Sequence, residues 1–182
     1  MRKHKPKVIF IGPLPPPHMG PSLATEIILN SDLKEKYDLV HLDTSDHRNL
    51  NKLAKYDLIN FYLGFKQYFD LVKLIINCKP DLVYLPICQT TIGYLRDSIV
   101  ILISKLFSIK VLCHLRGGNF KNWLNQSTWL TKKYVNMIHS FVDGQIVLGD
   151  SLRYMFDGLI SSKKIFVCPN ARDFKNTFNN KK

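Results

Sequence analysis

The stretch KVIFIGPLPPPHMG, residues 7–20, decides the fold. It opens with a short run of β-branched and aromatic side chains that a Gly-Pro pair ends, a pattern typical of a buried β-strand. Gly20 followed by Pro21 then indicates a helix start, with glycine as the cap and proline at the first helical position. The sequence therefore predicts a strand, a proline-rich loop and a helix in this order.

The same alternation continues along the chain. Short apolar runs predict further strands at residues 37–42, 81–86, 110–115, 144–148 and 164–168. Helices are predicted at residues 20–31, 58–76, 94–107 and 123–141. Six strands separated mostly by helices imply right-handed βαβ units and a parallel sheet covered on both faces. We therefore expect an α/β, Rossmann-like fold over residues 1–170 and a frayed tail over residues 171–182.

The predicted helices differ in polarity. The pattern over residues 58–76 is amphipathic. The residues on its apolar face are Leu58, Phe61, Phe65, Phe69, Val72 and either Ile75 or Ile76. The segment SIVILISKLFSI, residues 98–109, is apolar throughout except for Lys105. It is shorter than the roughly 20 apolar residues that span a bilayer. We interpret it as a buried helix.

The net charge is +12, from 26 basic and 14 acidic residues, with a pI near 9.6. Basic residues concentrate at the two ends of the chain, in residues 1–7 and 171–182. No recognised nucleic-acid module accompanies the charge, so we expect no nucleic-acid partner. Attraction to acidic lipids fits the charge about as well.

The cysteines and the amino terminus bear on the compartment. The four cysteines lie far apart in sequence and form no CxxC pair, which predicts neither a zinc site nor a disulfide framework. The basic start is followed by an apolar run too short for a signal peptide. We expect a cytoplasmic protein without a bound metal.

Glycine-marked loops follow the first and fourth predicted strands, where ligands of an open parallel sheet bind. The first loop lacks the G-x-G-x-x-G spacing, so NAD and FAD are not expected. The helix start at Gly20, Pro21 and Ser22 could hold a phosphate or another anion on its free N–H groups. The alternative is that these residues only begin the helix.

The segment HLRGG, residues 114–118, is the sharper candidate. His114 ends a strand, and Arg116 offers donors suited to phosphate or carboxylate. Gly117 and Gly118 provide backbone that a ligand can approach closely. Taken alone, His114 is also compatible with a purely structural histidine.

Two pairs of neighbouring residues, each with one aspartate, lie at other predicted helix starts. Arg96-Asp97 and Asp150-Ser151 are candidates for binding donor or acceptor, although an ordinary ion pair and ordinary caps explain them as well. No Ser/His/Asp order, pair of catalytic carboxylates or His/Cys metal cluster stands out. Hydrolase and metalloenzyme functions therefore lack support.

Five segments in this order resemble the amino-terminal half of family 4 glycosyltransferases of the GT-B fold: VIFIGPLPPPHMG, KPDLVYLPICQTTIGYLRDS, KVLCHLRGGNF, GQIVLGDSL and KIFVCPNARD. The resemblance implies transfer of a sugar from a nucleotide-sugar donor to an acceptor with retention of anomeric configuration, and no other cofactor. The amino-terminal domain of such enzymes largely receives the acceptor.

The resemblance also implies roles for individual residues. Gly20 would lie near the donor diphosphate, His114 near the transferred sugar as the catalytic residue, and residues 116–118 along the same cleft. The sequence departs from the family at Met19, where paired glycines are common, and at Ala171, where Pro-Asn-Gly is usual.

The donor-binding domain of the family has no counterpart in these 182 residues. We therefore expect a truncated or split transferase that is inactive or nearly so by itself, with a separately encoded donor domain as one partner. The alternative is a stand-alone Rossmann-like binding or regulatory module without catalysis.

The acceptor implied by the resemblance is a glycan or a lipid-linked sugar. The basic excess and the aromatic residues of the amphipathic helix suggest that such an acceptor is met at an anionic membrane surface. Packing in the core is the simpler explanation of these aromatic residues, which are Phe61, Tyr62, Phe65, Tyr68 and Phe69.

Overall fold

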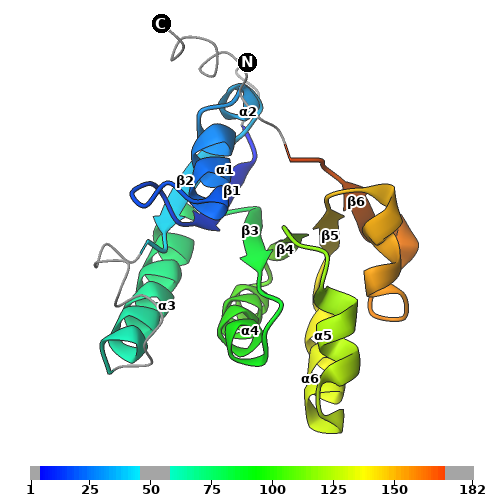
Figure 1. The fold of residues 1–182 in the computed structure, drawn as a ribbon. Coiled ribbons are helices and arrows are strands. Elements are labelled where there is room, and N and C mark those ends of the chain that lie inside the picture. The colour runs from blue at the N-terminus through cyan, green and yellow to red at the C-terminus, as the bar shows by residue number, and fades with distance from the viewer. Residues whose placement is uncertain (1–4, 46–57, 171–182) are drawn as a thin grey trace, which may run out of the picture.

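The computed structural model describes residues 5–45 and 58–170, apart from the side chains of residues 58–64. Within them, six parallel strands form one sheet in the order β2-β1-β3-β4-β5-β6 (Figure 1). The strands are β1 (Lys7–Gly12), β2 (Asp38–Asp43), β3 (Leu82–Ile87), β4 (Lys110–Leu115), β5 (Gly144–Val147) and β6 (Ile165–Val167). The predicted Rossmann-like sheet is confirmed, and the bounds of every strand lie within one residue of those predicted.

Helices cover both faces of the sheet. They are α1 (Gly20–Leu29), α2 (Leu33–Lys36), α3 (Leu58–Cys78), α4 (Thr91–Leu106), α5 (Phe120–Gln126) and α6 (Trp129–His139), with 3-10 helices η2 (Asp150–Phe156) and η3 (Ser162–Lys164). Figure 1 shows α1 on one side of the sheet and α3 to α6 on the other. The reason is that the chain moves from β1 toward β2 but from β3 toward β6, and right-handed crossovers in opposite directions lie on opposite faces.

Two apolar clusters hold these layers together. The larger lies between the sheet and α3 to α6, and includes the fully buried Leu71, Ile101 and Val135. The smaller lies under α1, where Phe10 and Tyr84 are buried beneath partly buried residues of the helix. The side chains of the candidate site lie on this α1 face.

The helix predicted over residues 123–141 is two helices, α5 and α6. The break falls at Ser127 and Thr128, and the Thr128 hydroxyl accepts a hydrogen bond from the Thr131 N–H at 3.3 Å. Threonine favours the cap position because its side chain satisfies a free N–H group of the first turn. The apolar periodicity carried on through the break and concealed it.

The prediction that α4 is a buried helix is wrong for one of its faces. Ile101 on the inner face is fully buried, but Leu106 on the outer face is 81% exposed. The outer face follows from the layer architecture, because a helix on an open sheet buries only the side that touches the sheet.

The apolar face predicted for α3 is only partly the buried one. Phe65 and Phe69 are 62% and 68% exposed, whereas Ile75, which the prediction gave as an alternative to Ile76, is buried together with Leu71. Core packing therefore does not explain these two phenylalanines, and the side chains of Phe61 and Tyr62 lie outside the described residues.

Some predictions concern segments that are not described. The predicted tail, residues 171–182, and most of the polar loop after β2 lie outside the described residues. In the part of the chain that is described, no helix combines the length and the apolar character needed to cross a bilayer.

Candidate functional site

The sheet topology selects one crevice for a ligand. β1 and β3 are neighbours, but the chain leaves them in opposite directions, so their carboxyl ends form the switch point where open α/β sheets bind ligands. The loops at this point are residues 13–19 after β1 and 88–90 after β3. The loop after β4, residues 116–119, adjoins them.

The helix after β1 begins one residue earlier than predicted. Met19 is its cap and Gly20 its first residue, so Pro21 stands second. The Ser22 hydroxyl donates to the Pro17 carbonyl at 2.6 Å and accepts from the Met19 N–H at 3.0 Å. Ser22 is thus engaged in holding the proline-rich loop against the helix.

His114 and Arg116 meet at a tyrosine that the sequence analysis did not single out. The Tyr84 hydroxyl lies 2.6 Å from His114 Nδ1 and accepts from the Arg116 guanidinium at 3.0 Å. Phe10 stacks on the Tyr84 ring, with centroids 4.2 Å apart. The sequence did offer a signal for Tyr84, because it is a tyrosine in a predicted buried strand. A buried tyrosine hydroxyl needs a polar partner, which indicates a polar cluster nearby.

Strand register explains why these side chains meet. Pro86 of β3 pairs with His114 of β4, and Tyr84 lies two residues before Pro86 on the same strand. Side chains two residues apart point to the same face of a sheet. Tyr84 and His114 therefore lie diagonally across neighbouring strands, on the face that α1 covers.

His114 is neutral at physiological pH. Its side chain is only 4% exposed, and burial together with the charge of Arg116 lowers its pKa to about 4. Because Arg116 donates to the Tyr84 oxygen, the single hydroxyl proton of Tyr84 is free for Nδ1. This network assigns the imidazole proton to Nε2, which has no hydrogen-bond partner among the described residues.

Arg116 joins the loop after β4 to the first turn of α1. One terminal nitrogen donates to the Pro21 carbonyl at 3.3 Å, while its Nε is buried without a partner among the described residues. The structure thus brings together His114, Arg116 and the helix start. Unused donors beside a helix amino terminus suit an oxygen-rich, anionic ligand.

Gly117 and Gly118 differ in their surroundings. A Cβ built on Gly117 would lie 1.9 Å from Nε2 of Gln89, whose Oε1 accepts the Asn119 N–H at 2.6 Å. A Cβ on Gly118 would meet only Leu152, at 4.0 Å. Gly117 therefore lets Gln89 join the loop after β3 to the loop after β4.

Replacing Gly117 by alanine is expected to destabilise the protein by about 1 kcal/mol, because the methyl group displaces Gln89 and leaves the Asn119 N–H without its acceptor. Gly118→Ala is the matched control and is expected to change stability by less than about 0.5 kcal/mol. Urea unfolding of both variants measures the difference. Equal stabilities would show that the contact with Gln89 contributes nothing.

Arg96 and Asp97 form an ion pair beside the site. Asp97 is 3% exposed and accepts from Arg96 Nε at 3.0 Å, from its terminal nitrogen at 2.8 Å and from the Cys88 N–H at 2.7 Å. Burial and the Asp97 charge raise the pKa of the Cys88 thiol to about 11, so it stays protonated. The prediction that this pair caps a helix is wrong, because Thr90 caps α4 and Asp97 lies in its second turn. Through Cys88, Asp97 instead joins α4 to the residue that follows β3.

Asp150 and Ser151 are the first residues of η2, so the prediction that they cap it is wrong: Gly149 is at the cap position, and no side chain caps this turn. The Asp150 carboxylate is 84% exposed and pairs with Arg153 Nε at 2.8 Å. Among the described residues, no hydrogen bond joins Asp150 or Ser151 to His114 or Arg116. These two candidates therefore lie apart from the cluster around Tyr84.

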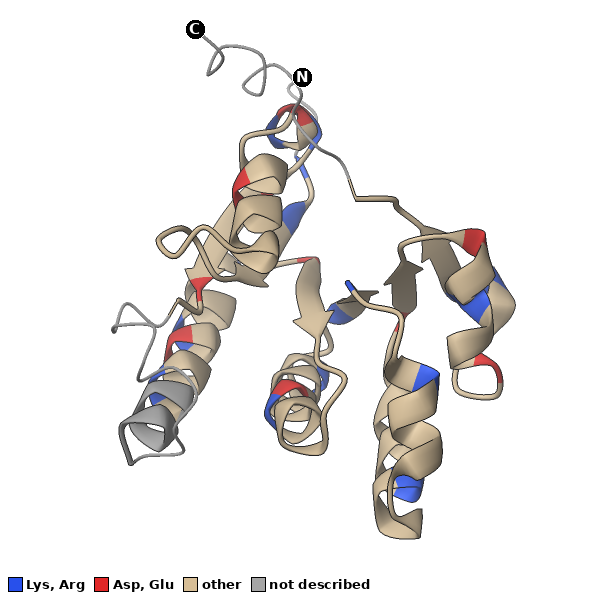
Figure 2. Ribbon diagram, in the orientation of Figure 1, with Lys and Arg blue, Asp and Glu red and all other residues tan. Residues whose placement is uncertain are grey.

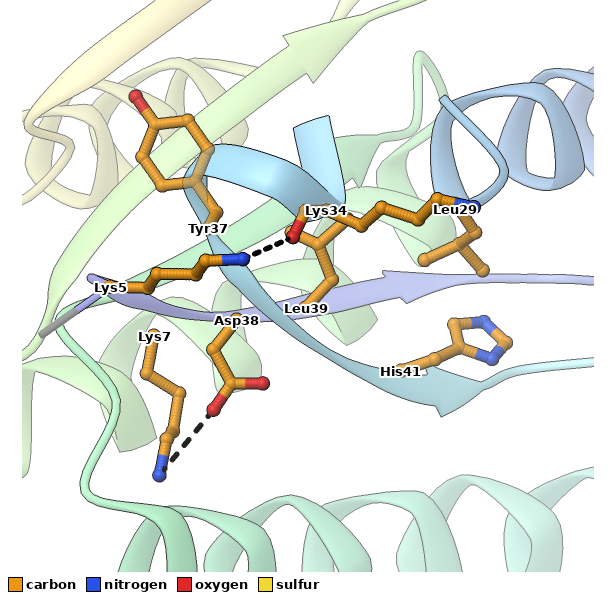
Figure 3. A pocket seen from close by; sticks show the side chains of 8 residues that line it. All are labelled: Lys5, Lys7, Leu29, Lys34, Tyr37, Asp38, Leu39 and His41. Carbon is orange, nitrogen blue, oxygen red and sulfur yellow. Dashed lines mark hydrogen bonds and ion pairs between the residues drawn. The ribbon is translucent and has the colours of Figure 1, made fainter. Parts of the chain in front are cut away.

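A lysine-rich pocket lies elsewhere, around the amino-terminal half of β1 and β2 (Figure 3). Its lining is Lys5, Lys7, Leu29, Lys34, Tyr37, Asp38, Leu39 and His41. Lys5 donates to the Lys34 carbonyl at 3.1 Å, and the Lys7 ammonium lies 3.8 Å from Asp38. Because two of its three lysines already have partners and it lies away from the strand carboxyl ends, we place the candidate site at His114.

Comparison with known proteins gives structural neighbours only. Neither protein-family models nor curated proteins match the sequence. A candidate UDP-N-acetylglucosamine 2-epimerase from Listeria monocytogenes superimposes with a TM-score of 0.55 and 11% identity, over 91% of this chain and 45% of that one. The S. aureus MnaA–UDP complex gives a TM-score of 0.54 and 13% identity, over 89% and 43%.

MurG of Acinetobacter baumannii is also similar, with a TM-score of 0.41 and 13% identity, over 97% of this chain and 49% of that chain. This chain spans less than half the length of each of the three structures. The first two superpositions show a shared Rossmann-like fold.

Proposed function

We propose that this chain is the acceptor-side domain of a retaining glycosyltransferase of family 4, acting with a donor-binding domain on a surface glycan. The observation that carries the proposal is the buried His114 at the carboxyl end of β4, whose pKa is lowered to about 4 and whose Nε2 has no partner among the described residues. A neutral imidazole donor suits a sugar hydroxyl or a phosphate oxygen. In the enzymes that the sequence resembles, a strand-end histidine lies near the transferred sugar.

The ligand class follows from the surroundings of His114. Arg116 Nε and the amino terminus of α1 favour negative charge, which a nucleoside diphosphate carries. The MnaA structure contains UDP, and the Listeria neighbour is described as acting on a UDP-sugar, so the shared fold is compatible with such ligands. We therefore assign Gly20 and Pro21 to the diphosphate side and His114 to the sugar side.

Nucleotide binding tests this proposal on the chain itself. Titration with UDP-N-acetylglucosamine, followed by NMR, is expected to shift the ring signals of His114, and UDP, which lacks the sugar, is expected to shift them less. We expect weak affinity, with a dissociation constant on the order of 1 mM, equivalent to about 4 kcal/mol. The reason is that the resemblance assigns most donor contacts to the other domain. By the same argument the chain alone is expected to transfer no sugar.

Two variants make the titration specific. His114→Ala is expected to weaken binding about tenfold, corresponding to one lost hydrogen bond to a charged ligand. Lys34→Gln, in the lysine-rich pocket, is the control and is expected to leave binding unchanged. Binding that depends on Lys34 and ignores His114 would contradict the proposed site.

A further inference from the structure

One side of the helical layer exposes large apolar side chains on three neighbouring helices, one row on each. This surface is here called the apolar face. Its members are Phe65, Phe69 and Ile76 of α3, Ile92, Leu95, Ile99, Leu102 and Leu106 of α4, Leu130 and Met137 of α6, and Phe141 just after α6. On α4 these residues follow one another at intervals of three and four, which places them on one side of the helix. Each is at least 39% exposed.

The three rows lie next to one another. α4 packs between α3 and α6. The Tyr68 hydroxyl of α3 donates to the Arg96 carbonyl of α4 at 3.2 Å, and the Tyr134 hydroxyl of α6 lies 2.6 Å from Ser98 Oγ of α4. Tyr68 precedes Phe69, and Tyr134 lies between Leu130 and Met137, so both contacts bring the rows of α3 and α6 alongside that of α4.

The outer side of α4 is unusual for a helix facing water. Its inner side is buried at Tyr94 and Ile101, and its outer side is apolar as well. A surface helix ordinarily places polar side chains opposite its buried ones, whereas the outer side of α4 is apolar except for Arg96. Exposed apolar areas of this extent mark interaction sites on soluble proteins.

Basic side chains predominate among the exposed charges around the apolar face. In the described part of α3, α4 and α6, every exposed charged side chain is basic, namely Lys66, Lys73, Arg96, Lys132 and Lys133. Of the acidic residues in these helices, Asp70 is half-buried and Asp97 is buried against Arg96. Figure 2 shows these helices tan over most of their length, with both blue and red segments on α3 and α4 and blue on α6.

A tryptophan stands at the rim of the apolar face. Trp129, at the start of α6, is 65% exposed, and the Lys133 ammonium lies 4.3 Å from its ring centroid. Tryptophan and lysine are the side chains that settle at the boundary between hydrocarbon and water. The rim therefore has the chemistry of a lipid headgroup layer.

We infer that the apolar face docks this domain onto a bilayer that contains anionic lipids. α3, α4 and α6 lie in the plane of the surface, their apolar side chains enter the headgroup boundary, and the surrounding lysines bind lipid phosphates. A second copy of the chain is the less suitable occupant, because pairing the face with itself brings lysines against lysines. The inference does not depend on the proposed function, since neither sugar nor nucleotide takes part in it.

Vesicle binding tests the inference on the full chain. Co-sedimentation with vesicles of phosphatidylcholine and phosphatidylglycerol is expected to capture the protein, and binding is expected to weaken as salt screens the lysines. The triple variant Ile99→Gln, Leu102→Gln, Leu106→Gln is expected to weaken partitioning by roughly tenfold for each side chain removed. The control Phe166→Gln changes a residue that is 52% exposed on the last strand and is expected to bind as the wild type does.

The lysines have a matched control of their own. Lys132→Gln with Lys133→Gln is expected to weaken binding about fivefold for each charge removed. The exposed neighbours Lys163 and Lys164 of η3, replaced in the same way, are expected to have a smaller effect. Circular dichroism and thermal melting establish that each variant is folded, which exposed positions should permit.

Three outcomes would overturn the inference. The wild type fails to bind anionic vesicles; the triple variant binds as tightly as the wild type; or the purified chain dimerises in solution and the triple variant is monomeric. The last result would assign the apolar face to a second copy. Loss of binding in the triple variant but not in Phe166→Gln would support docking at this face.

Discussion

The free energy of unfolding is expected to fall by about 4 kcal/mol when the pH is lowered from 7 to 5. Two buried histidines cause this loss. Burial, reinforced at His114 by the charge of Arg116, lowers the pKa of His114 to about 4, and burial lowers the pKa of His139 to about 4. Each contributes about 2 kcal/mol over this pH range, because an unfolded histidine has a pKa near 6.5.

The direction of the effect follows from the lowered pKa values. Above about pH 6.5 both histidines are neutral whether the chain is folded or unfolded, so they impose no pH dependence. As the pH falls from about 6.5 to 4, the unfolded chain takes up protons that the folded chain does not, and stability is lost. Below about pH 4 both states are protonated, and the loss is complete.

Urea unfolding at pH 7 and pH 5 measures this loss. Replacing either His114 or His139 by glutamine, which does not titrate, is expected to halve it. His139 needs a polar replacement because its Nδ1 lies 2.6 Å from the Tyr94 hydroxyl in the core. His18→Gln, at an exposed loop position, is the control and is expected to keep the pH dependence of the wild type. Equal stability at both pH values would contradict the conclusion that burial lowers the pKa of these two histidines.

Asp97→Ala is expected to destabilise the protein by about 3 kcal/mol. The substitution removes the acceptor of the Cys88 N–H and both hydrogen bonds from Arg96. Asp97 is almost fully buried, so no water replaces it, although the Arg96 side chain, 55% exposed, recovers part of its hydration. These contacts join α4 to the residue that follows β3, so the substitution weakens that connection.

Asp150→Ala provides the comparison within the same chain. It breaks the Asp150–Arg153 ion pair, which at 2.8 Å is as short as the shorter Arg96–Asp97 contact. The Asp150 carboxylate, however, is 84% exposed. We expect a cost below about 0.5 kcal/mol, since exposed ion pairs contribute little. Denaturation of both variants tests whether the burial of an ion pair, and not its length, determines how much it contributes to stability. Similar losses in the two variants would exclude burial as the deciding factor.

The sheet was predictable from the sequence because each strand is a short apolar run between breakers. The two walls of the candidate site followed from the same pattern, since parallel strands bring their carboxyl ends to one edge. Tyr84 was not found in this way. Its part in the site depends on the pairing of β3 with β4, and strand order is set by packing between residues distant in sequence.

The helices show what hydrophobic periodicity cannot decide. The pattern over α3 predicted one apolar row that runs from Phe65 and Phe69 to Ile75 or Ile76, but the buried row runs through Leu71 and Ile75. Both rows have helical spacing, and only the neighbouring α4 and the sheet determine which one turns inward. The Ser-Thr break before α6 was hidden for a related reason, since a local cap outweighed a continuing apolar pattern.

The location of His114 relative to the apolar face has a consequence for substrate length. His114 and Tyr84 lie on the α1 side of the sheet, and the apolar face lies on the outer side of α3, α4 and α6. On a bilayer, a helical layer about 10 Å thick, together with the sheet, therefore separates the site from the headgroups. A sugar attached directly to a lipid phosphate would stay below the site, whereas the end of a longer glycan would reach it. Under the two proposals made above, acceptors that already carry several sugars are expected to bind in preference to shorter ones.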